Sequence, residues 1–399
     1  MKSPALFTAA DRMQQQLAKH CYWDEFEQVL YIDARKLFPK EGVVTILGRY
    51  NMMMNALPVP PSPDFFKILS WSKHPQYADW RKQIPKWVQE SCALFPTHQM
   101  TLLHYAGKYP QVLELLDHAP MLAWRLVRST LEEPEIVALL SGKRADIAKT
   151  VGWPGKVETV KFLTNLRLRL VNKEIAEQIE TCLLDEQRLT ALQNLPRINS
   201  MALSLAARFP ELIGSKLHHA LAQLPCRPMQ CQSMIAQLED AYRVAEYLDF
   251  GEKTVNKIGQ CRYLIEVTKI YQAWLNDVID SFKPDNVALH SSIQKRFSQD
   301  LSAEPVVINE LEGWIALMQI QQHAWLTDYD CGVQLMAWKD EDGIWGALIH
   351  SLLPETPNQI EAENMASNVI RVRGLDNALA GAKQHSTLHL WQAKQIKTT

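Results

Sequence analysis

Five side chains capable of acid, base or nucleophile chemistry lie within nine positions, in the segment HAWLTDYDC: His323, Asp328, Tyr329, Asp330 and Cys331. A cysteine becomes a nucleophile when a base or a cation stabilises its thiolate. The neighbouring carboxylates and the end of a preceding helix disfavour a thiolate, but both favour a protonated imidazole. The segment therefore predicts a cationic His323 in a polar cluster rather than a reactive Cys331.

Two interpretations of this segment remain open. In the structural one, the aspartates and the tyrosine join the end of a helix to the following strand. In the catalytic one, a hydrolase or nuclease site is completed by Arg371 and Arg373 of a later strand, NVIRVRG. His323 then acts as general acid or base beside Tyr329, and the arginines stabilise an anion. The catalytic interpretation requires these side chains to converge around a cleft.

A second candidate is the segment HHALAQLPCRPMQC, which contains His218, His219, Cys226 and Cys231. Tetrahedral zinc is held by two close pairs of Cys and His ligands. Four residues separate the two cysteines here, which is a long spacing for such a pair. Adjacent helical side chains point about 100 degrees apart, so only one of the two histidines could bind. We therefore expect a loop between packed helices and predict no metal site.

The third candidate is a basic stretch, residues 143–173, with eight Lys or Arg residues and two acidic ones. Such a surface contacts nucleic-acid phosphates without reading bases, and Trp153 offers a ring on which an unpaired base could stack. The residues that we expect to contact phosphates are Lys156, Lys161, Arg167, Arg169 and Lys173. The alternative is a solvated helix face whose charge is balanced by acidic neighbours in the fold.

The sequence contains none of the common catalytic or nucleotide-binding signatures HExxH, GxSxG and GxGxxG. The segment GWPGK resembles a phosphate loop only superficially, because the glycine spacing and the Ser or Thr after the lysine are missing. We therefore predict no cofactor and favour a protein without catalytic activity.

Composition sets the broad class of protein. The chain has 399 residues, of which 47% are apolar and 22% charged, as in ordinary globular proteins. With 42 basic and 44 acidic residues, the molecule as a whole has no strong attraction to nucleic acid or anionic lipid. Seven scattered cysteines indicate reduced thiols. No apolar run reaches the roughly 18 residues of a membrane span, and no secretory signal is evident, so we expect a cytoplasmic protein.

Three regions follow from the sequence pattern. Residues 1–90 are irregular α+β, with a helix expected over 8–20, strands at VLYIDA and VVTILGRY, and a linker containing four prolines between 58 and 63. Residues 91–300 have apolar residues at helical spacing almost throughout, which predicts an irregular array of helical hairpins. Residues 301–399 predict a small α+β domain of order helix, strand, strand, strand, helix. The fold class is therefore mainly α.

Two details of the helical array can be tested directly. Prolines at 110, 120, 134, 196 and 210 each predict the first turn of a new helix, where the missing N–H costs nothing. Near the end of the array, SMIAQLEDAYRVAEYLDFG and the stretch 254–282 each have an apolar stripe. Ser233 and Gly251 are suitable caps for the first of these helices, and the short turn between the two predicts an antiparallel hairpin.

The segments 101–113 and 201–213 also correspond at a spacing of one hundred residues. Leu103 pairs with Leu203, Ala106 with Ala206, Tyr109 with Phe209, and Pro110 with Pro210. The chain has no regular short period of the kind that solenoid families show, so an irregular array remains the expected arrangement.

This combination resembles the PcfJ-like proteins, named for a component of conjugative plasmids. In that pattern a helical region with an LPRIN-like segment precedes a compact end domain, which has a His-Cys…Tyr element, a hairpin, and a strand running into Gly-x-x-Asn. Here LPRIN occupies residues 195–199, RGLDN supplies Gly374 and Asn377, and the opening segment supplies His323 and Tyr329. The family cysteine is replaced by Ala324. The resemblance implies the domain division and an association with mobile genetic elements, and it implies no particular activity.

Taken together, these features favour a non-enzymatic interaction or scaffold protein of a mobile-element or host-response assembly. Its array offers grooves to protein partners, and its basic segment contacts nucleic-acid phosphates. The alternative is a hydrolase or nuclease with its site in the C-terminal domain, formed by His323, Tyr329, Arg371 and Arg373.

Overall fold

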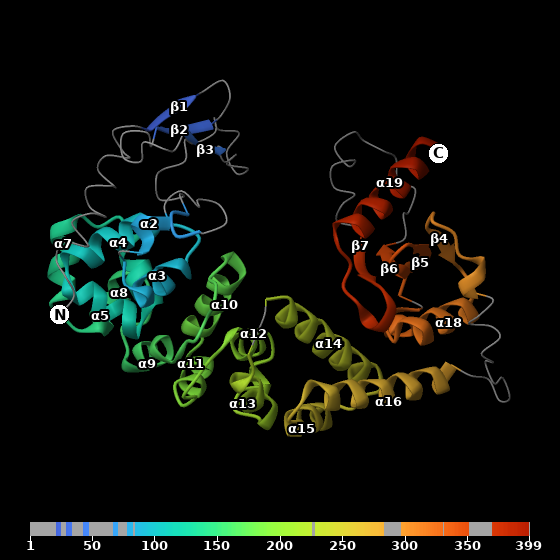
Figure 1. The fold of residues 1–399 in the computed structure, drawn as a ribbon. Helices are drawn as coiled ribbons and strands as arrows, with labels where there is room; N and C mark the ends of the chain where they lie inside the picture. The colour runs from blue at the N-terminus through green and yellow to red at the C-terminus, as the bar shows by residue number, and fades with distance from the viewer. Residues whose placement is uncertain are drawn as a thin grey trace. The chain divides into compact units, whose positions relative to one another are not determined.

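The computed structural model describes residues 21–24, 29–33, 43–47, 67–70, 78–82, 84–225, 228–282, 297–329, 331–350 and 369–398. The fold is mainly α with a small antiparallel sheet near the C-terminus, as the sequence predicts (Figure 1). The chain divides into two compact units, and the division falls within helix α13 (Lys216–Gln223). Unit 1 comprises residues 1–214 with 222–225, and unit 2 comprises 215–221 with 226–399.

The first described elements of unit 1 form a three-stranded antiparallel sheet of strands β1 (Cys21–Asp24), β2 (Val29–Asp33) and β3 (Val43–Leu47) in the order β1-β2-β3. The two strands expected from VLYIDA and VVTILGRY are confirmed as β2 and β3, and β1 is an addition. The helix expected over 8–20 and the prolines between 58 and 63 lie outside the described residues.

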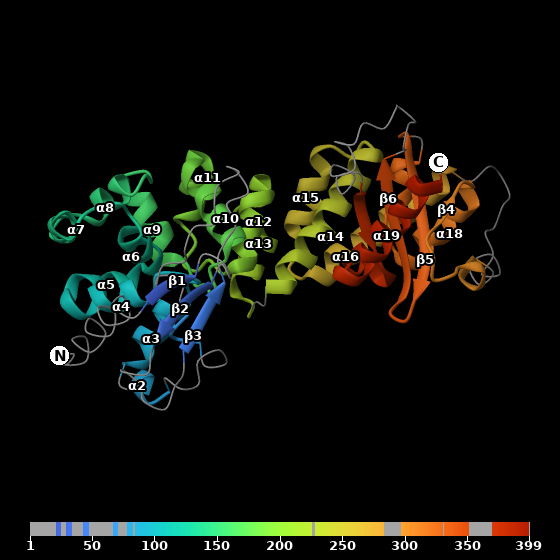
Figure 2. The same cartoon turned by 90° about the horizontal axis from the view of Figure 1, so that it is seen from above.

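The other elements described in unit 1 are short helices. They are α2 (Ala78–Lys82), α3 (Lys86–Ala93), α4 (Gln99–Lys108), α5 (Pro110–His118), α6 (Pro120–Val127), α7 (Glu133–Leu140), α8 (Arg144–Thr150), α9 (Val157–Asn165), α10 (Lys173–Leu184), α11 (Glu186–Leu192), α12 (Ser200–Arg208) and the 3-10 helix η3 (Pro210–Leu212). The last α-helices, α10 to α12, lie side by side (Figure 2).

Four of the five prolines expected to begin a helix lie in the first turn of one. Pro110, Pro120 and Pro210 occupy the first position of α5, α6 and η3, and Pro134 lies in the first turn of α7. The expectation is wrong at Pro196, which begins no helix. There the helix α12 begins four residues later, because the Asn199 side chain accepts a hydrogen bond from Ala202 N at 2.9 Å and caps the helix.

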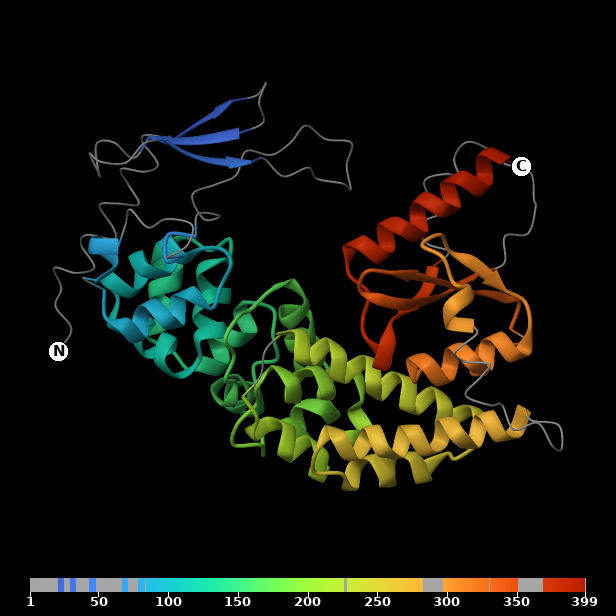
Figure 3. The ribbon, with the colours of Figure 1, turned by 45° about the vertical axis from the view of Figure 1, so that its right-hand side comes forward.

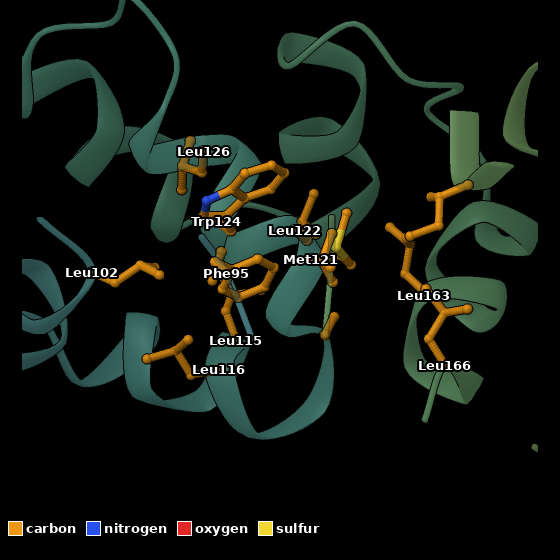
Figure 4. Packing of buried hydrophobic residues seen from close by; sticks show 14 of the residues in the cluster. Phe95, Leu102, Leu115, Leu116, Met121, Leu122, Trp124, Leu126, Leu163 and Leu166 are labelled. Carbon is orange, nitrogen blue, oxygen red and sulfur yellow. The ribbon is translucent and has the colours of Figure 1, made fainter. Parts of the chain in front are cut away.

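The core of unit 1 is built from apolar side chains of successive helices. The rings of Phe95 and Trp124 stack with centroids 4.9 Å apart, and Leu115 and Leu122 lie around them (Figure 4). The positions that correspond at a spacing of one hundred residues have matching roles. Leu103 and Leu203 are both fully buried. In each of the two segments an aromatic residue follows the end of one helix, and the proline after it begins the next helix.

Unit 2 contains most of α13 and then three helices, α14 (Pro228–Tyr247), α15 (Glu252–Gln260) and α16 (Leu264–Phe282). The antiparallel hairpin expected here is wrong, because the stretch 254–282 is broken into two helices. Helices α14 and α16 run in the same direction (Figure 3): Gln237 Nε2, in the middle of α14, donates to Thr268 Oγ1 near the start of α16, and Tyr247 stacks on Phe282 at the ends of both helices. The chain returns between them through α15.

Helix α14 also begins and ends where the sequence did not indicate. It begins at Pro228 rather than at Ser233. It ends with Asp249 in the left-handed region (φ 54°) and a hydrogen bond from Phe250 N to Ala245 O, which is the pattern of a Schellman cap. Gly251 instead precedes the first residue of α15.

The remainder of unit 2 is a four-stranded antiparallel sheet between helices. Its strands are β4 (Val306–Ile308), β5 (Val333–Asp340), β6 (Gly343–His350) and β7 (Val369–Arg373), in that order across the sheet. Helices α18 (Leu311–Gln321) and α19 (Ala382–Thr398) lie on opposite sides of it (Figure 1). The predicted order is therefore confirmed except for the additional short strand β4, which precedes the first helix.

The two compact units do not separate at residue 300, where the sequence pattern changes. Helices α14 to α16, which the sequence pattern assigns to the helical array, belong to the same unit as the C-terminal sheet. Among the described helices, none is both long and apolar enough to cross a lipid bilayer.

Candidate functional site: a buried charge cluster

The chemically notable site of unit 2 is a charge cluster around Asp240, a fully buried residue of α14. Asn377 Nδ2 donates a hydrogen bond to Asp240 Oδ2 at 2.7 Å. Arg243 Nη1 lies 3.0 Å from the other carboxylate oxygen, Oδ1. His323 Nδ1 and Arg373 Nε lie 3.2 and 3.9 Å from Oδ2. The arginine and histidine contacts are ion-pair distances without the alignment of a linear hydrogen bond.

His323, which is fully buried, connects Asp240 to Arg371. Its Nε2 lies 3.3 Å from Arg371 Nη1, and a guanidinium nitrogen can only donate, so Nε2 must accept. The proton of the neutral ring is therefore on Nδ1, which faces Asp240. Burial lowers the pKa of His323 to about 4; Asp240 opposes this shift, and Arg371 and Arg373 add to it. The expectation of a cationic histidine is wrong, because burial outweighs the carboxylate.

Arg371 extends the cluster to the surface. Its Nη2 donates to both carboxylate oxygens of Asp328, at 3.1 and 3.3 Å, and Asp328 belongs to the 3-10 helix η4 (Trp325–Asp328). Burial lowers the pKa of Arg371, and the neighbouring charge of Arg243 lowers it further. The cluster is thus a chain of contacts in which a carboxylate, an imidazole, a guanidinium and a second carboxylate follow one another.

Asp240 is ionised despite its burial. Burial by itself raises the pKa of this carboxyl, whereas His323, Arg243 and Arg373 lower it, and the net shift of the pKa is downward. Arg243 and Arg373 keep their charge when His323 is neutral, and Asn377 donates a hydrogen bond to the carboxylate, so all three favour the ionised form.

A β-bulge in β7 turns both arginines toward the helices. Leu348 of β6 pairs with Arg371 and Ile349 pairs with Val369, so Ile370 is an extra residue in β7. Val369 and Val372 consequently pack on the α19 side of the sheet, with Trp345 and Leu388. In a regular strand Val369 would share the face of the arginines.

The residues after β7 place Asn377. A Cβ atom at Gly374 would lie only 2.8 Å from the Trp345 ring, so the backbone passes this ring at a distance that a side chain forbids. Asn377 has a left-handed backbone (φ 61°) in the 3-10 helix η6 (Leu375–Asn377), which ends with its amide against Asp240. Both positions that carry the Gly-x-x-Asn resemblance therefore have a local structural role.

A buried amide fixes α18 and η4 to the sheet beside the cluster. Gln321 Nε2 donates to the carbonyl oxygens of Ile344 and Arg373, at 2.9 and 3.1 Å, and Trp325 Nε1 donates to Gln321 Oε1 at 2.8 Å. This contact requires a glycine in β6, because a Cβ atom at Gly346 would lie 2.6 Å from Gln321 Oε1.

The four residues of the predicted catalytic site are only partly brought together. His323, Arg371 and Arg373 belong to the cluster. Tyr329 instead contacts the rings of Trp314 and Phe282 edge-on, with centroids 5.1 and 6.0 Å away. Cys331 is an exposed free thiol, and Asp330 lies outside the described residues.

The comparisons with known proteins give no family. No family model, curated protein or solved structure matches the chain. The cluster and the basic segment must therefore be interpreted from their own geometry.

Sequence reasoning missed Asp240 and Arg243. One signal was present, since Asp240 lies between Leu238 and Ala241 on a helix whose buried positions are otherwise apolar. A carboxylate at a core position of an amphipathic helix indicates a buried partner elsewhere in the chain.

The basic stretch of unit 1 is largely exposed. Lys161, Arg167, Arg169 and Lys173 are all exposed. Lys156 lies 2.6 Å from Glu186, and Lys173 lies 3.7 Å from Glu177, so two of the five predicted phosphate contacts have acidic neighbours.

Two other predictions for side chains have different outcomes. Trp153 is buried and has the guanidinium of Arg125 over its ring, so the expectation that it stacks on a base is wrong. Of the weighed zinc ligands, His218 and Cys231 are buried, and Cys226 lies outside the described residues. The described part of the chain contains no group of three His, Cys, Asp or Glu side chains arranged for a metal ion.

Proposed function

We propose that this protein is a non-enzymatic interaction protein. The observation that carries the proposal is the position of its histidine–aspartate pair. His323 and Asp240 are fully buried, and both ring nitrogens of the histidine face protein groups. A general acid or base must reach a substrate proton within hydrogen-bond distance. The pair is placed instead where it joins helix α14 to strand β7 and the end of α18.

The hydrolase alternative is less well supported by the same residues. It requires His323, Tyr329 and an arginine around a cleft, whereas the tyrosine packs between aromatic rings. The neutral His323 ring contacts protein groups through both of its nitrogens. It would have to break its contact with Arg371 before it could accept a proton from a substrate.

The interaction surface that we propose for nucleic acid is the connection between α9 and α10. Its backbone is held in place by hydrogen bonds from Arg167 N to Ile198 O at 2.8 Å and from Val171 N to Leu94 O at 2.7 Å. Arg167 and Arg169 are exposed along this connection, while Leu166 and Val171 are buried. Lys161 and Arg169 form no ion pair within the described part of the chain. An anchored backbone with exposed cations suits contact with successive phosphates.

Salt-dependent binding tests this surface. Fluorescence anisotropy would measure the affinity of the protein for a single-stranded and a duplex oligonucleotide between about 50 and 200 mM salt, a range over which phosphate contacts lose most of their strength. The test variant combines Lys161→Ala, Arg169→Ala and Lys173→Ala. The control combines Lys82→Ala, Lys86→Ala and Lys253→Ala, which remove three exposed cations elsewhere.

We expect the wild type and the control to bind, and the test variant to lose about 0.9 in the slope of log affinity against log salt for each duplex contact removed. Absence of binding at about 50 mM salt, or equal slopes for the test variant and the control, would exclude this surface.

We also propose, from the resemblance to PcfJ-like proteins, that the partners belong to a mobile-element or host-response assembly. Affinity purification from cells with and without a conjugative plasmid tests this association. Enrichment of plasmid-encoded proteins with the wild type is expected, and identical partners in the two kinds of cell would contradict it.

A further inference from the structure

The charges of the buried cluster do not balance among the described residues. Three guanidinium groups, those of Arg243, Arg371 and Arg373, face two carboxylates, those of Asp240 and Asp328. His323 adds no charge because its Nε2 accepts from an arginine. Within the part of the chain that the structure describes, one positive charge is therefore left over in a largely buried site. A buried charge of this kind is costly unless an opposite charge accompanies it.

The excess charge lies where solvent can reach it. The side chain of Arg243 is 25% exposed, and those of Arg371 and Arg373 are each 11% exposed, whereas Asp240 is fully buried beneath them. The cationic side of the cluster thus faces outward, and the carboxylate that anchors it faces the interior.

Donors without acceptors accompany the excess charge. Among the described residues, the buried Nε of Arg373 has no hydrogen-bond acceptor, and the buried Tyr271 hydroxyl, which lies at the backbone amide of Ala324, has no acceptor for its own proton. The hydroxyl of Tyr271, on α16, interacts electrostatically with Asp240, Arg243 and Arg373. Among the same residues, the carboxylate side of the cluster has two unpaired acceptors, Asp240 Oδ1 and Asn377 Oδ1. Buried donors in native proteins are nearly always paired, so the unpaired donors on the cationic side favour an additional acceptor there.

We propose that Arg243, Arg371 and Arg373 form an anion-binding site in unit 2 whose ligand is a carboxylate. A carboxylate carries the single negative charge that the cluster lacks, and its two oxygens match the fork of a guanidinium. A doubly charged phosphate monoester would reverse the imbalance rather than remove it. The carboxylate belongs either to a small acid or to the C-terminus of a partner chain. This site is independent of the proposed nucleic-acid surface, which lies in unit 1.

Acetate is the probe for the shared chemistry. Urea unfolding is measured in increasing sodium acetate, and sodium chloride keeps the ionic strength constant. A specific site stabilises the folded protein in a saturable manner, and at an acetate concentration ten times the dissociation constant it lowers the unfolding equilibrium constant about elevenfold. A general salt effect rises without saturating and is the same in every variant.

The decisive variant is Arg243→Met, which leaves two guanidinium groups for two carboxylates. Its response to acetate should be lost, whereas Arg262→Met, which removes an exposed arginine of the same unit, should respond as the wild type does. If Arg243→Met does not fold, Arg243→Lys replaces it: this variant keeps the charge, loses the fork, and should require several-fold more acetate for the same stabilisation.

Two further probes identify the source and the class of the anion. Triglycine with a free C-terminus is compared with its C-terminal amide: a stabilisation by the free acid alone indicates a chain terminus, and acetate without triglycine indicates a small acid. The proposal is overturned if acetate acts no differently from chloride. It is also overturned if Arg243→Met, or the lysine variant that replaces it, keeps the full saturable response, or if phosphate stabilises the protein at lower concentration than acetate.

Discussion

Replacing Asp240 by asparagine removes the anchor of the cluster with almost no change in volume. The asparagine can still accept the hydrogen bond that Asn377 donates at 2.7 Å, but it loses the negative charge that faces Arg243 at 3.0 Å and Arg373 at 3.9 Å. Three guanidinium groups would then share the single carboxylate of Asp328. Removing one partner of a buried ion pair costs about 3–5 kcal/mol, because the remaining charge stays buried without compensation.

We therefore expect Asp240→Asn to destabilise unit 2 by about 4 kcal/mol. Urea unfolding measures the change, and with a denaturant slope of about 2 kcal/mol per molar the midpoint would fall by about 2 M. Hydrogen exchange of the backbone amides of β5 to β7 assigns the loss to unit 2, because the protection of these amides reflects opening of the sheet.

The matched control is Asp342→Asn, which makes the same chemical change in the same unit at an exposed position. Asp342 lies 3.4 Å from Lys383, and both side chains are more than half exposed. A surface pair of this kind contributes about 0–1 kcal/mol. A loss for Asp240→Asn no larger than that of the control would refute the view that an ionised Asp240 holds the cluster together.

Three further outcomes follow from the same geometry. Burial lowers the pKa of His323 to about 4, so between pH 6.5 and 4 the unfolded chain binds more protons than the folded protein. The free energy of unfolding should therefore fall as the pH falls, by up to about 1.4 kcal/mol per pH unit. In urea titrations His323→Asn should remove this part of the pH dependence, and the exposed-site control His350→Asn should keep it. Gly346→Ala should cost about 1–3 kcal/mol through its clash with the buried amide, against almost nothing for Gly381→Ala, whose Cβ would find its nearest neighbour at 3.4 Å. Trp124→Ala should cost about 3–5 kcal/mol, detected as lost exchange protection in unit 1 but not in the sheet of unit 2.

The sequence predicted elements well where local pattern decides them. Helix starts at Pro110, Pro120 and Pro210 are properties of single residues, and the strands β5 and β6 follow from two apolar runs, VQLMAW and IWGALIH, on either side of the acidic turn KDEDG. The antiparallel hairpin predicted for α14 to α16 was wrong for a related reason. An apolar stripe over 254–282 continues through the break between α15 and α16, so periodicity alone shows one helix where the backbone makes two.

The cluster could be predicted only in part, because its contacts join distant segments. Asp240 and Asn377 are separated by 137 positions, and no local pattern pairs them. Arg371 and Arg373 were recognised as partners of His323, but the charge of the histidine was predicted from its neighbours in sequence. Its protonation depends on burial, which the sequence near residue 323 does not reveal.

The cluster also explains why strand β7 adopts one register. A shift of one residue would turn Arg371 and Arg373 toward the α19 side, where Trp338 and Trp345 form an apolar core, and would place Val372 beside Asp240. Both exchanges bury unpaired polar groups, so the ionic contacts penalise the wrong register more strongly than apolar contacts would. Replacing Asp240, Arg371 and Arg373 together by leucine should therefore retain a folded sheet but allow two registers. Doubled amide resonances for β7 in NMR spectra would support this role for the charges, and a single sharp set would contradict it.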